Sequence, residues 1–186
     1  KIGISLMFIL LFNFLTYKGM ETSAVMLTAF AIITIGSLLG LIIPGLRVMD
    51  FNNMVPFFTH SFSKVFIAIF FIAETFFGWE TATFLSEETK DPRKNIPKAL
   101  IYGTVIIAIM CILFVVTSLG VIPWQTFGLS QVPLADLAGV HYGPVGVQAF
   151  TILVYLSIIG SVAGWIVSAP RLILALARDK LFISQC

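Results

Sequence analysis

The chain has 186 residues, of which 59% are hydrophobic and 11% are charged, and its mean hydropathy is +1.03. Soluble domains average about 45–50% apolar and about 25% charged residues. The chain has too little polar surface for a water-facing fold, so a soluble enzyme is excluded. The net charge of +2 is also far from the strongly basic balance of a nucleic-acid-binding protein. A membrane is therefore the expected environment, and helices are the expected structure.

Both ends of the sequence resemble internal positions of a longer chain. The chain begins with Lys1 rather than Met, enters an apolar stretch at once, and stops at Cys186, shortly after an expected helix end. The lone thiols Cys111 and Cys186 form no disulfide framework. We expect a fragment of a longer membrane protein. The expected partners of this fragment are the missing helices of the same chain and the surrounding lipid.

Five apolar segments are candidate membrane spans, because a bilayer-spanning helix needs roughly 20 apolar residues at about 1.5 Å each. They cover residues 2–15, 23–43, 62–85, 99–122 and 147–177. The first is short enough to be a truncated span. Pro44-Gly45 is expected to end the second and Pro123-Trp124 the fourth, while Pro97 suits the first turn of the fourth. Residues 1–186 are thus interpreted as part of one all-α transmembrane domain.

The basic residues predict the orientation. Eight Lys and Arg residues follow the first, third and fifth spans, and three lie on the opposite side. Cytoplasmic loops are enriched in Lys and Arg. We therefore expect residues 17–21, 86–98 and 178–186 to be cytoplasmic and the loop 124–143, which has no Lys or Arg, to face outside.

The third segment has the strongest functional pattern. Glu74 lies in its middle, near the bilayer midplane, where a charged group costs about 2.5–3.5 kcal/mol on insertion scales. The β-branched Thr75 and the helix-weakening Gly78 follow within four residues. A helix interrupted at midplane exposes backbone groups that lipid cannot satisfy, so they line a cavity or a bound solute, as in secondary transporters. The pattern predicts a break between Glu74 and Gly78 and a solute site there. Phe76 and Phe77 lie in this interval, but their aromatic character alone does not assign them to the site.

Other polar residues of the spans have competing interpretations. Glu80 fits a structural hydrogen bond as well as it fits a role in ion coupling. Ser157 and Ser161 offer oxygens for a hard cation, but with Gly160 and Gly164 nearby they also fit close helix packing. The sequence has no metal-ligand cluster and no His or Asp within a span, so nothing in it indicates an intramembrane enzyme or a cofactor. The coupling ions that remain open are H⁺ and Na⁺.

Three stretches resemble the amino acid–polyamine–organocation superfamily of permeases. They are residues 76–80 (Phe-Phe-Gly-Trp-Glu), the loop 87–99, which is the most specific, and residues 160–179, which begin Gly-Ser-Val-Ala-Gly-Trp and end Ala-Arg-Asp. The resemblance covers nearly the whole chain, as helices four to eight of the family. It implies a partial inverted-repeat (5+5) transporter fold. It also implies that Phe76 and Trp165 face the solute. Trp165 equally fits a groove between helices, and Trp79 fits simple packing.

The sequence departs from the family pattern at a few positions. Glu74 stands where the family has an aromatic or small residue, which suits a cationic amino acid, an amine or a moving proton. Trp79 replaces a Phe and Lys180 replaces a Gly. Residues 23–43 lack the lysine that some proton-coupled relatives have in the corresponding helix, so coupling through Glu74, coupling to sodium, and exchange all stay open.

The leading functional hypothesis is a secondary transporter, in the plasma membrane, for amino acids or related amines, working by alternating access. A non-transporting membrane sensor or structural subunit with the same fold is the second hypothesis. A cation channel ranks last, because residues 23–43 and 99–122 lack the polar stripe of a pore.

Overall fold

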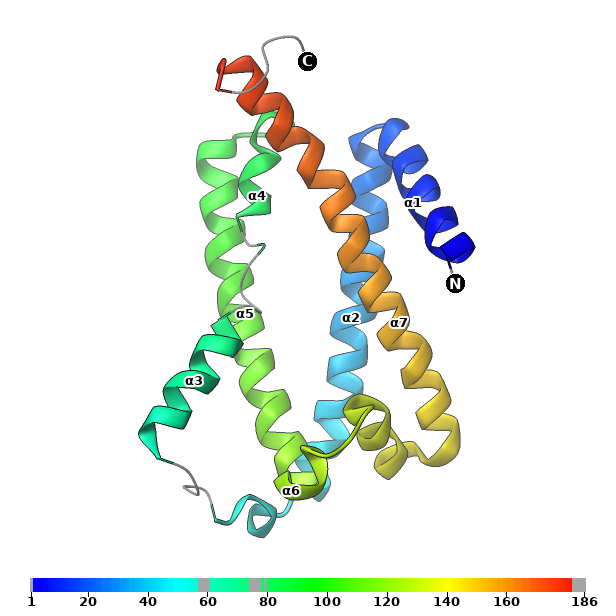
Figure 1. Cartoon of the computed structure of the whole chain (residues 1–186), viewed down its shortest axis with the longest axis vertical. Coiled ribbons are helices and arrows are strands. Elements are labelled where there is room, and N and C mark those ends of the chain that lie inside the picture. Colours follow the sequence, from blue (N-terminus) through cyan, green and yellow to red (C-terminus); the bar gives the residue numbers. More distant parts are fainter. Residues whose placement is uncertain (1, 57–60, 74–77, 79, 182–186) are drawn as a thin grey trace. The chain divides into compact units, whose positions relative to one another are not determined.

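The computed structural model describes residues 2–56, 61–73, 78 and 80–181, and every regular element in these ranges is a helix (Figure 1). The α-helices are α1 (Ile2–Tyr17), α2 (Met20–Val48), α3 (Phe62–Ala73), α4 (Thr81–Phe84), α5 (Pro92–Val121), α6 (Trp124–Phe127) and α7 (Pro133–Arg178). Two short 3₁₀ helices, η1 (Phe51–Met54) and η3 (Ser86–Glu88), complete the set. The all-α fold expected from the sequence is confirmed.

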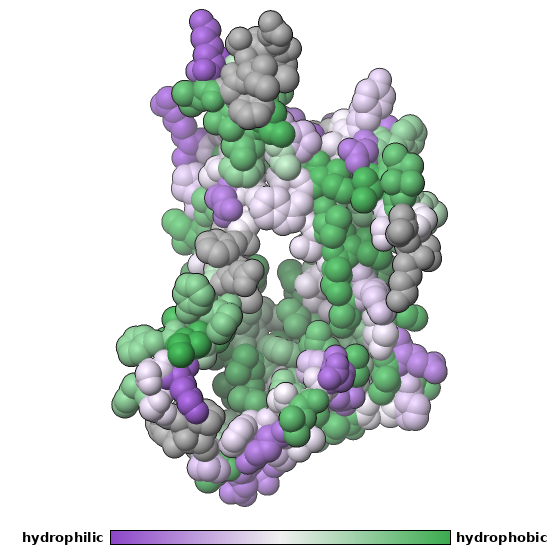
Figure 2. All heavy atoms as spheres, in the orientation of Figure 1, coloured by the Kyte–Doolittle hydropathy of each residue, from purple (hydrophilic) through white to green (hydrophobic). Residues whose placement is uncertain are grey.

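Three of the helices are long and apolar enough to cross a membrane. They are α2 from Glu21 to Val48, α5 and α7, and shorter apolar helices cover Ser5–Tyr17 and Phe62–Ala73. Hydrophobic side chains make up most of the visible helix surfaces (Figure 2), and α5 has none of its most apolar stretch buried within the chain. Apolar surface of this kind needs lipid or other protein against it, so the chain is part of an integral membrane protein.

The described chain forms two compact units. The first comprises residues 1–32, 78–103 and 156–186, and the second comprises residues 33–77 and 104–155. Each of the helices α2, α5 and α7 contributes residues to both units.

In the first unit, α1, α2 and α7 pack through small residues and aromatic rings. The rings of Phe12 on α1 and Phe30 on α2 meet edge to face, 6.1 Å apart. A Cβ atom placed on Gly160 of α7 would lie 2.6 Å from Cβ of Phe30, so only glycine permits this approach. Ala163, one turn farther along α7, is fully buried. The structure thus supports the packing interpretation of the small residues on α7.

In the second unit, the core contains Leu41 of α2 together with Leu137, Ala138 and Phe150 of α7. The α2 helix passes through Pro44 and ends at Val48, so the helix end expected at Pro44-Gly45 is corrected. Proline lacks the N–H that would bond the carbonyl four residues earlier, which is that of Gly40.

The hydroxyl of Tyr142 on α7 replaces the missing donor. It donates to the Gly40 carbonyl at 2.7 Å, and its ring stacks on Phe150 with centroids 5.7 Å apart. Glycine at position 40 leaves room for this arrangement, since a Cβ there would lie 3.3 Å from Cζ of Phe150. A tertiary hydrogen bond therefore lets α2 continue through its proline.

Replacing Tyr142 with Phe should destabilise the intact protein by about 0.5–1.5 kcal/mol, because the Gly40 carbonyl loses its donor while the ring stacking is kept. The readout is the apparent melting temperature in detergent. Tyr155→Phe is the matched control, since Tyr155 is another exposed tyrosine of α7 and its hydroxyl has no hydrogen bond among the described residues. An equal effect of the two substitutions would contradict the role assigned to Tyr142.

Two further helix bounds differ from expectation. The α5 helix begins at Pro92, so Pro97 lies inside it rather than in its first turn. The Asp91 carbonyl accepts the N–H groups of Lys94 and Asn95 at 3.0 Å, which places Pro92 at the first helical position, where its missing N–H costs nothing. In place of the long loop expected over 124–143, α6 and the first part of α7 are helical, and Gly143 breaks α7 with φ 66° and ψ −159°.

The third apolar segment is divided. The α3 helix ends at Ala73, α4 begins at Thr81, and Gly78 between them has φ 107°. That dihedral angle is incompatible with a continuous α-helix, so a single helix over 62–85 is excluded at Gly78. Residues 74–77 and 79 lie outside the described residues, and with them most of the interval in which the sequence predicts the break.

Candidate functional site

The interruption at Gly78 has its own polar partners in the first unit. The Gly78 N–H donates to Oε2 of Glu80 at 2.9 Å. The Gly78 carbonyl accepts the backbone N–H of Thr81 at 3.1 Å and its Oγ1–H at 2.6 Å. A positive φ at this position favours glycine, because other residues meet steric strain there. Glu80 thus has a structural contact, which is one of the two roles that the sequence predicts for it.

Trp165 of α7 lies beside this interruption. A Cβ atom on Gly78 would be 3.6 Å from Cζ2 of Trp165, an ordinary van der Waals distance. The Trp165 side chain is large and 49% exposed, so an apolar ring face adjoins the non-helical backbone. Two of the predicted site residues, far apart in the sequence, are therefore neighbours.

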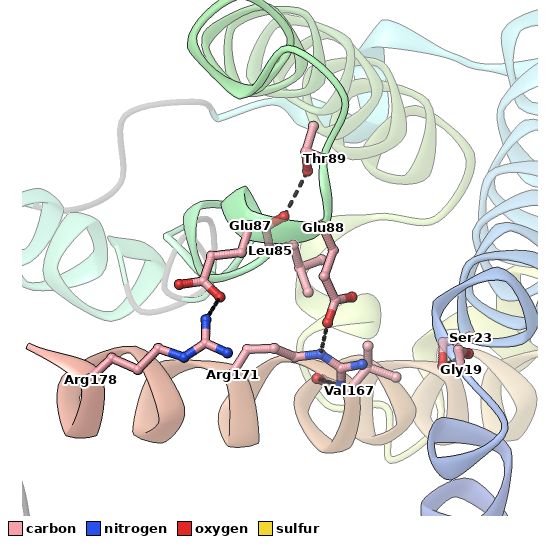
Figure 3. Close-up of polar contacts among 9 residues, drawn as sticks. All are labelled: Gly19, Ser23, Leu85, Glu87, Glu88, Thr89, Val167, Arg171 and Arg178. Atoms are coloured by element: carbon pink, nitrogen blue, oxygen red, sulfur yellow. Dashed lines mark hydrogen bonds and ion pairs between the residues drawn. The ribbon is translucent and has the colours of Figure 1, made fainter. Parts of the chain in front are cut away.

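Two ion pairs join the segment after the interruption to α7 (Figure 3). Oε1 of Glu88 lies 3.2 Å from Nε of Arg171, Glu87 pairs with Arg178, and Arg171 also donates to the carbonyl of Val167. The side chains of Arg171 and Glu88 are 16% and 36% exposed, against 59% and 53% for Arg178 and Glu87. Water screens the first pair less, so removing one of its partners should cost more stability.

The segment from Gly78 to Glu88 therefore contacts α7 at three levels, which are Trp165, Arg171 and Arg178. Along α7 these levels span about 20 Å at about 1.5 Å per residue. Thr89 Oγ1 donates to the Leu85 carbonyl at 2.7 Å and adds a bond at the end of this segment. The segment after the interruption thus has contacts along this length of α7.

The remaining predicted residues are placed as follows. Glu74, Thr75, Phe76 and Phe77 lie outside the described residues. Ser161 is exposed and Ser157 is half-buried on α7, and among the described residues no group of His, Cys, Asp and Glu side chains has the arrangement of a metal site. The cation-binding hypothesis for the two serines stays a prediction.

Sequence reasoning missed the ion pairs, although a complementary charge pattern was present. Arg171 and Arg178 are seven residues apart, nearly two helical turns, and so share one face of α7. Glu87 and Glu88 are adjacent in the preceding loop. Two cations on one helix face and two neighbouring carboxylates are complementary, but they became specific partners only once the fold placed the loop against α7.

Comparison with known proteins agrees with this architecture. Residues 1–185 match the amino acid permease family. A branched-chain amino acid permease, BcaP, of Lactococcus lactis is 23% identical over 96% of this chain and 40% of its own length. BcaP of Bacillus subtilis is 32% identical over 41% of this chain and 16% of its own length. The vacuolar cationic amino acid transporter 4 of Arabidopsis thaliana is 24% identical over 58% of this chain and 18% of its own length.

The chain thus spans 40% or less of the length of these curated relatives. No solved structure matches it. The family match covers nearly every residue and agrees with the all-α membrane architecture and with the resemblance seen in the sequence. The chain belongs to the amino acid permease family.

Proposed function

We propose that the whole protein is a secondary transporter of amino acids or related amines in the plasma membrane, and that it works by alternating access. The observation that carries the proposal is the non-helical Gly78 next to Trp165. Backbone groups that leave a helix inside a membrane need a polar partner or a solute. At Gly78 those partners are Glu80 and Thr81, so an amino acid there would meet these polar side chains together with the aromatic face of Trp165.

The solute is proposed to bind near the bilayer midplane around residues 74–78, with Trp165 along its path. Transport rather than catalysis follows from the family. The relatives are named for branched-chain and for cationic amino acids, so both classes are candidate substrates. An acid at position 74 favours the cationic class, because a carboxylate near midplane needs a positive partner to offset its desolvation.

The experiment is uptake by the intact protein reconstituted in vesicles. Lysine, arginine, leucine and an amine are supplied at two pH values, with and without sodium. Uptake of at least one solute that is competed by the unlabelled solute supports transport. Absence of uptake and of exchange for all solutes, from protein that is folded in the vesicles, would contradict it. A proton or sodium gradient that drives accumulation identifies the coupling ion, and accumulation without either identifies exchange.

In this assay Glu74→Gln should weaken uptake of cationic solutes about tenfold or more, because a charge-assisted hydrogen bond to a solute is worth about 1.5–3 kcal/mol. Neutral solutes should be nearly unaffected, since glutamine preserves the shape of the side chain. The measurement is the apparent affinity for lysine and for leucine at two pH values.

The experiment distinguishes the two candidate partners of Glu74, which are a cationic solute and a proton. If the partner is a proton, the variant keeps binding and loses pH-dependent accumulation instead. Glu80→Gln is the control, because it alters a nearby carboxylate whose contact is with the Gly78 backbone. A Glu74 variant that equals the wild type for every solute and pH would contradict the cationic preference.

A further inference from the structure

In the loop that precedes α5, two acidic side chains have ion-pair partners, whereas the basic side chains have none among the described residues. Its carboxylates Glu87 and Glu88 are directed to the arginines of α7 (Figure 3). The basic residues that follow are exposed, and within the part of the chain that the structure describes, neither ion pair includes any of them. We call them the basic cluster: Lys90, Arg93, Lys94 and Lys98.

The neighbouring carboxylates do not neutralise the basic cluster. Asp91 is the only acidic residue between Thr89 and Lys98. The α7 arginines hold the other two carboxylates of the loop, so these pairs leave an excess of positive charge at the start of α5. Lys94 and Lys98 are four residues apart and share one face of the helix.

The position of the basic cluster along α5 is that of lipid headgroups. No charged residue occurs from Ala99 to Val121, a length of about 35 Å at about 1.5 Å per residue. The hydrocarbon core of a bilayer is about 30 Å thick. The cluster therefore lies at the boundary of the hydrocarbon, where long basic side chains reach phosphate groups.

The residues next to the basic cluster are those that acyl chains would contact. Ile101 and Tyr102 lie three and four residues after Lys98, on the same side of α5, and are 60% and 64% exposed. A headgroup bound at Lys98 would place its acyl chains along these side chains. An acidic protein segment would match the charges but not the apolar surface below them.

We propose that the basic cluster is a binding surface for anionic phospholipid. It holds the headgroup phosphate through Lys and Arg side chains, and Ile101 and Tyr102 contact the acyl chains. The surface is separate from the solute site around Gly78, and its occupancy is measured without transport.

The test measures lipid binding to the intact protein, purified in neutral detergent, by native mass spectrometry. Phosphatidylglycerol and phosphatidylcholine with the same acyl chains are compared. Wild-type protein should prefer phosphatidylglycerol, and the preference should weaken at high salt, which screens exposed charges. Equal affinity for the two lipids would overturn the proposal. Displacement of phosphatidylglycerol by equimolar inorganic phosphate would also overturn it, since the acyl chains would then contribute nothing.

Replacing all four residues of the basic cluster with Gln should weaken phosphatidylglycerol binding on the order of 1,000-fold, since each cation near an anionic surface contributes about 1 kcal/mol. The matched control replaces four cations elsewhere, Lys18, Arg47, Lys64 and Lys180, and should keep the affinity. An equal loss in the control would overturn the proposal. A third variant, with the three lysines of the cluster replaced by Arg, keeps the charge and should bind like the wild type; loss of binding there would count against the proposal even if the Gln variant does not fold.

Discussion

Replacing Arg171 with Gln should lower the free energy of unfolding of the intact permease by about 1–3 kcal/mol, between the values for exposed and buried ion pairs. The guanidinium is mostly buried, and its loss leaves Glu88 without its cation and the Val167 carbonyl without an extra donor. The apparent melting temperature in detergent is the readout.

Arg178→Gln provides the matched control on the same face of α7. Its pair with Glu87 is more than half exposed on both sides, so the expected loss is about 0–1 kcal/mol. The double variant Arg171→Gln with Glu88→Gln should recover part of the stability, because no unpaired carboxylate remains. If Arg178→Gln lowers the free energy of unfolding as much as Arg171→Gln does, burial does not determine how much stability each pair contributes.

Replacing Gly78 with Ala should reduce transport about 5- to 150-fold, because strain at such a dihedral angle costs about 1–3 kcal/mol. Space is not the expected cause, since among the described residues the added methyl would meet only Trp165, at an ordinary distance. Uptake by reconstituted protein at matched protein amounts is the measurement.

Gly19 is the control for strain alone. It also has a positive φ, 115°, and a Cβ there would have no neighbour within 4 Å. Gly19→Ala should therefore lower the melting temperature by a similar amount and leave uptake unchanged, because Gly19 is in the turn between α1 and α2. Wild-type uptake by Gly78→Ala would contradict a role of the interruption in transport.

The apolar helices could be predicted from the sequence because their composition alone requires a membrane. The end expected at Pro123-Trp124 agrees with α5, which ends at Val121, but the end expected at Pro44 does not, because tolerance of a proline depends on distant partners. The donor that serves the Gly40 carbonyl comes from Tyr142, 102 residues later. Pro92 and Pro97 both suit a first helical turn, and the carbonyl of Asp91, which accepts the first N–H groups of α5, distinguishes them only in the folded chain.

A non-helical residue at Gly78 was predictable because its cause is local: a glycine follows a β-branched residue and an acid in the middle of an apolar segment. The ion pairs are not local. Glu88 and Arg171 are 83 residues apart, and Glu87 and Arg178 are 91 apart. Charged residues in a short loop usually indicate only exposure to water. Their partners could therefore be identified only once the fold placed the loop against α7.

The bond between Tyr142 and Gly40 has a consequence for the order of events during synthesis. Translation proceeds at about 5–20 residues per second, so 102 residues take about 5–20 s. During that interval the Gly40 carbonyl must be hydrated or bonded by another donor. The proline-containing end of α2 therefore completes its hydrogen bonding only after the first part of α7 has been made.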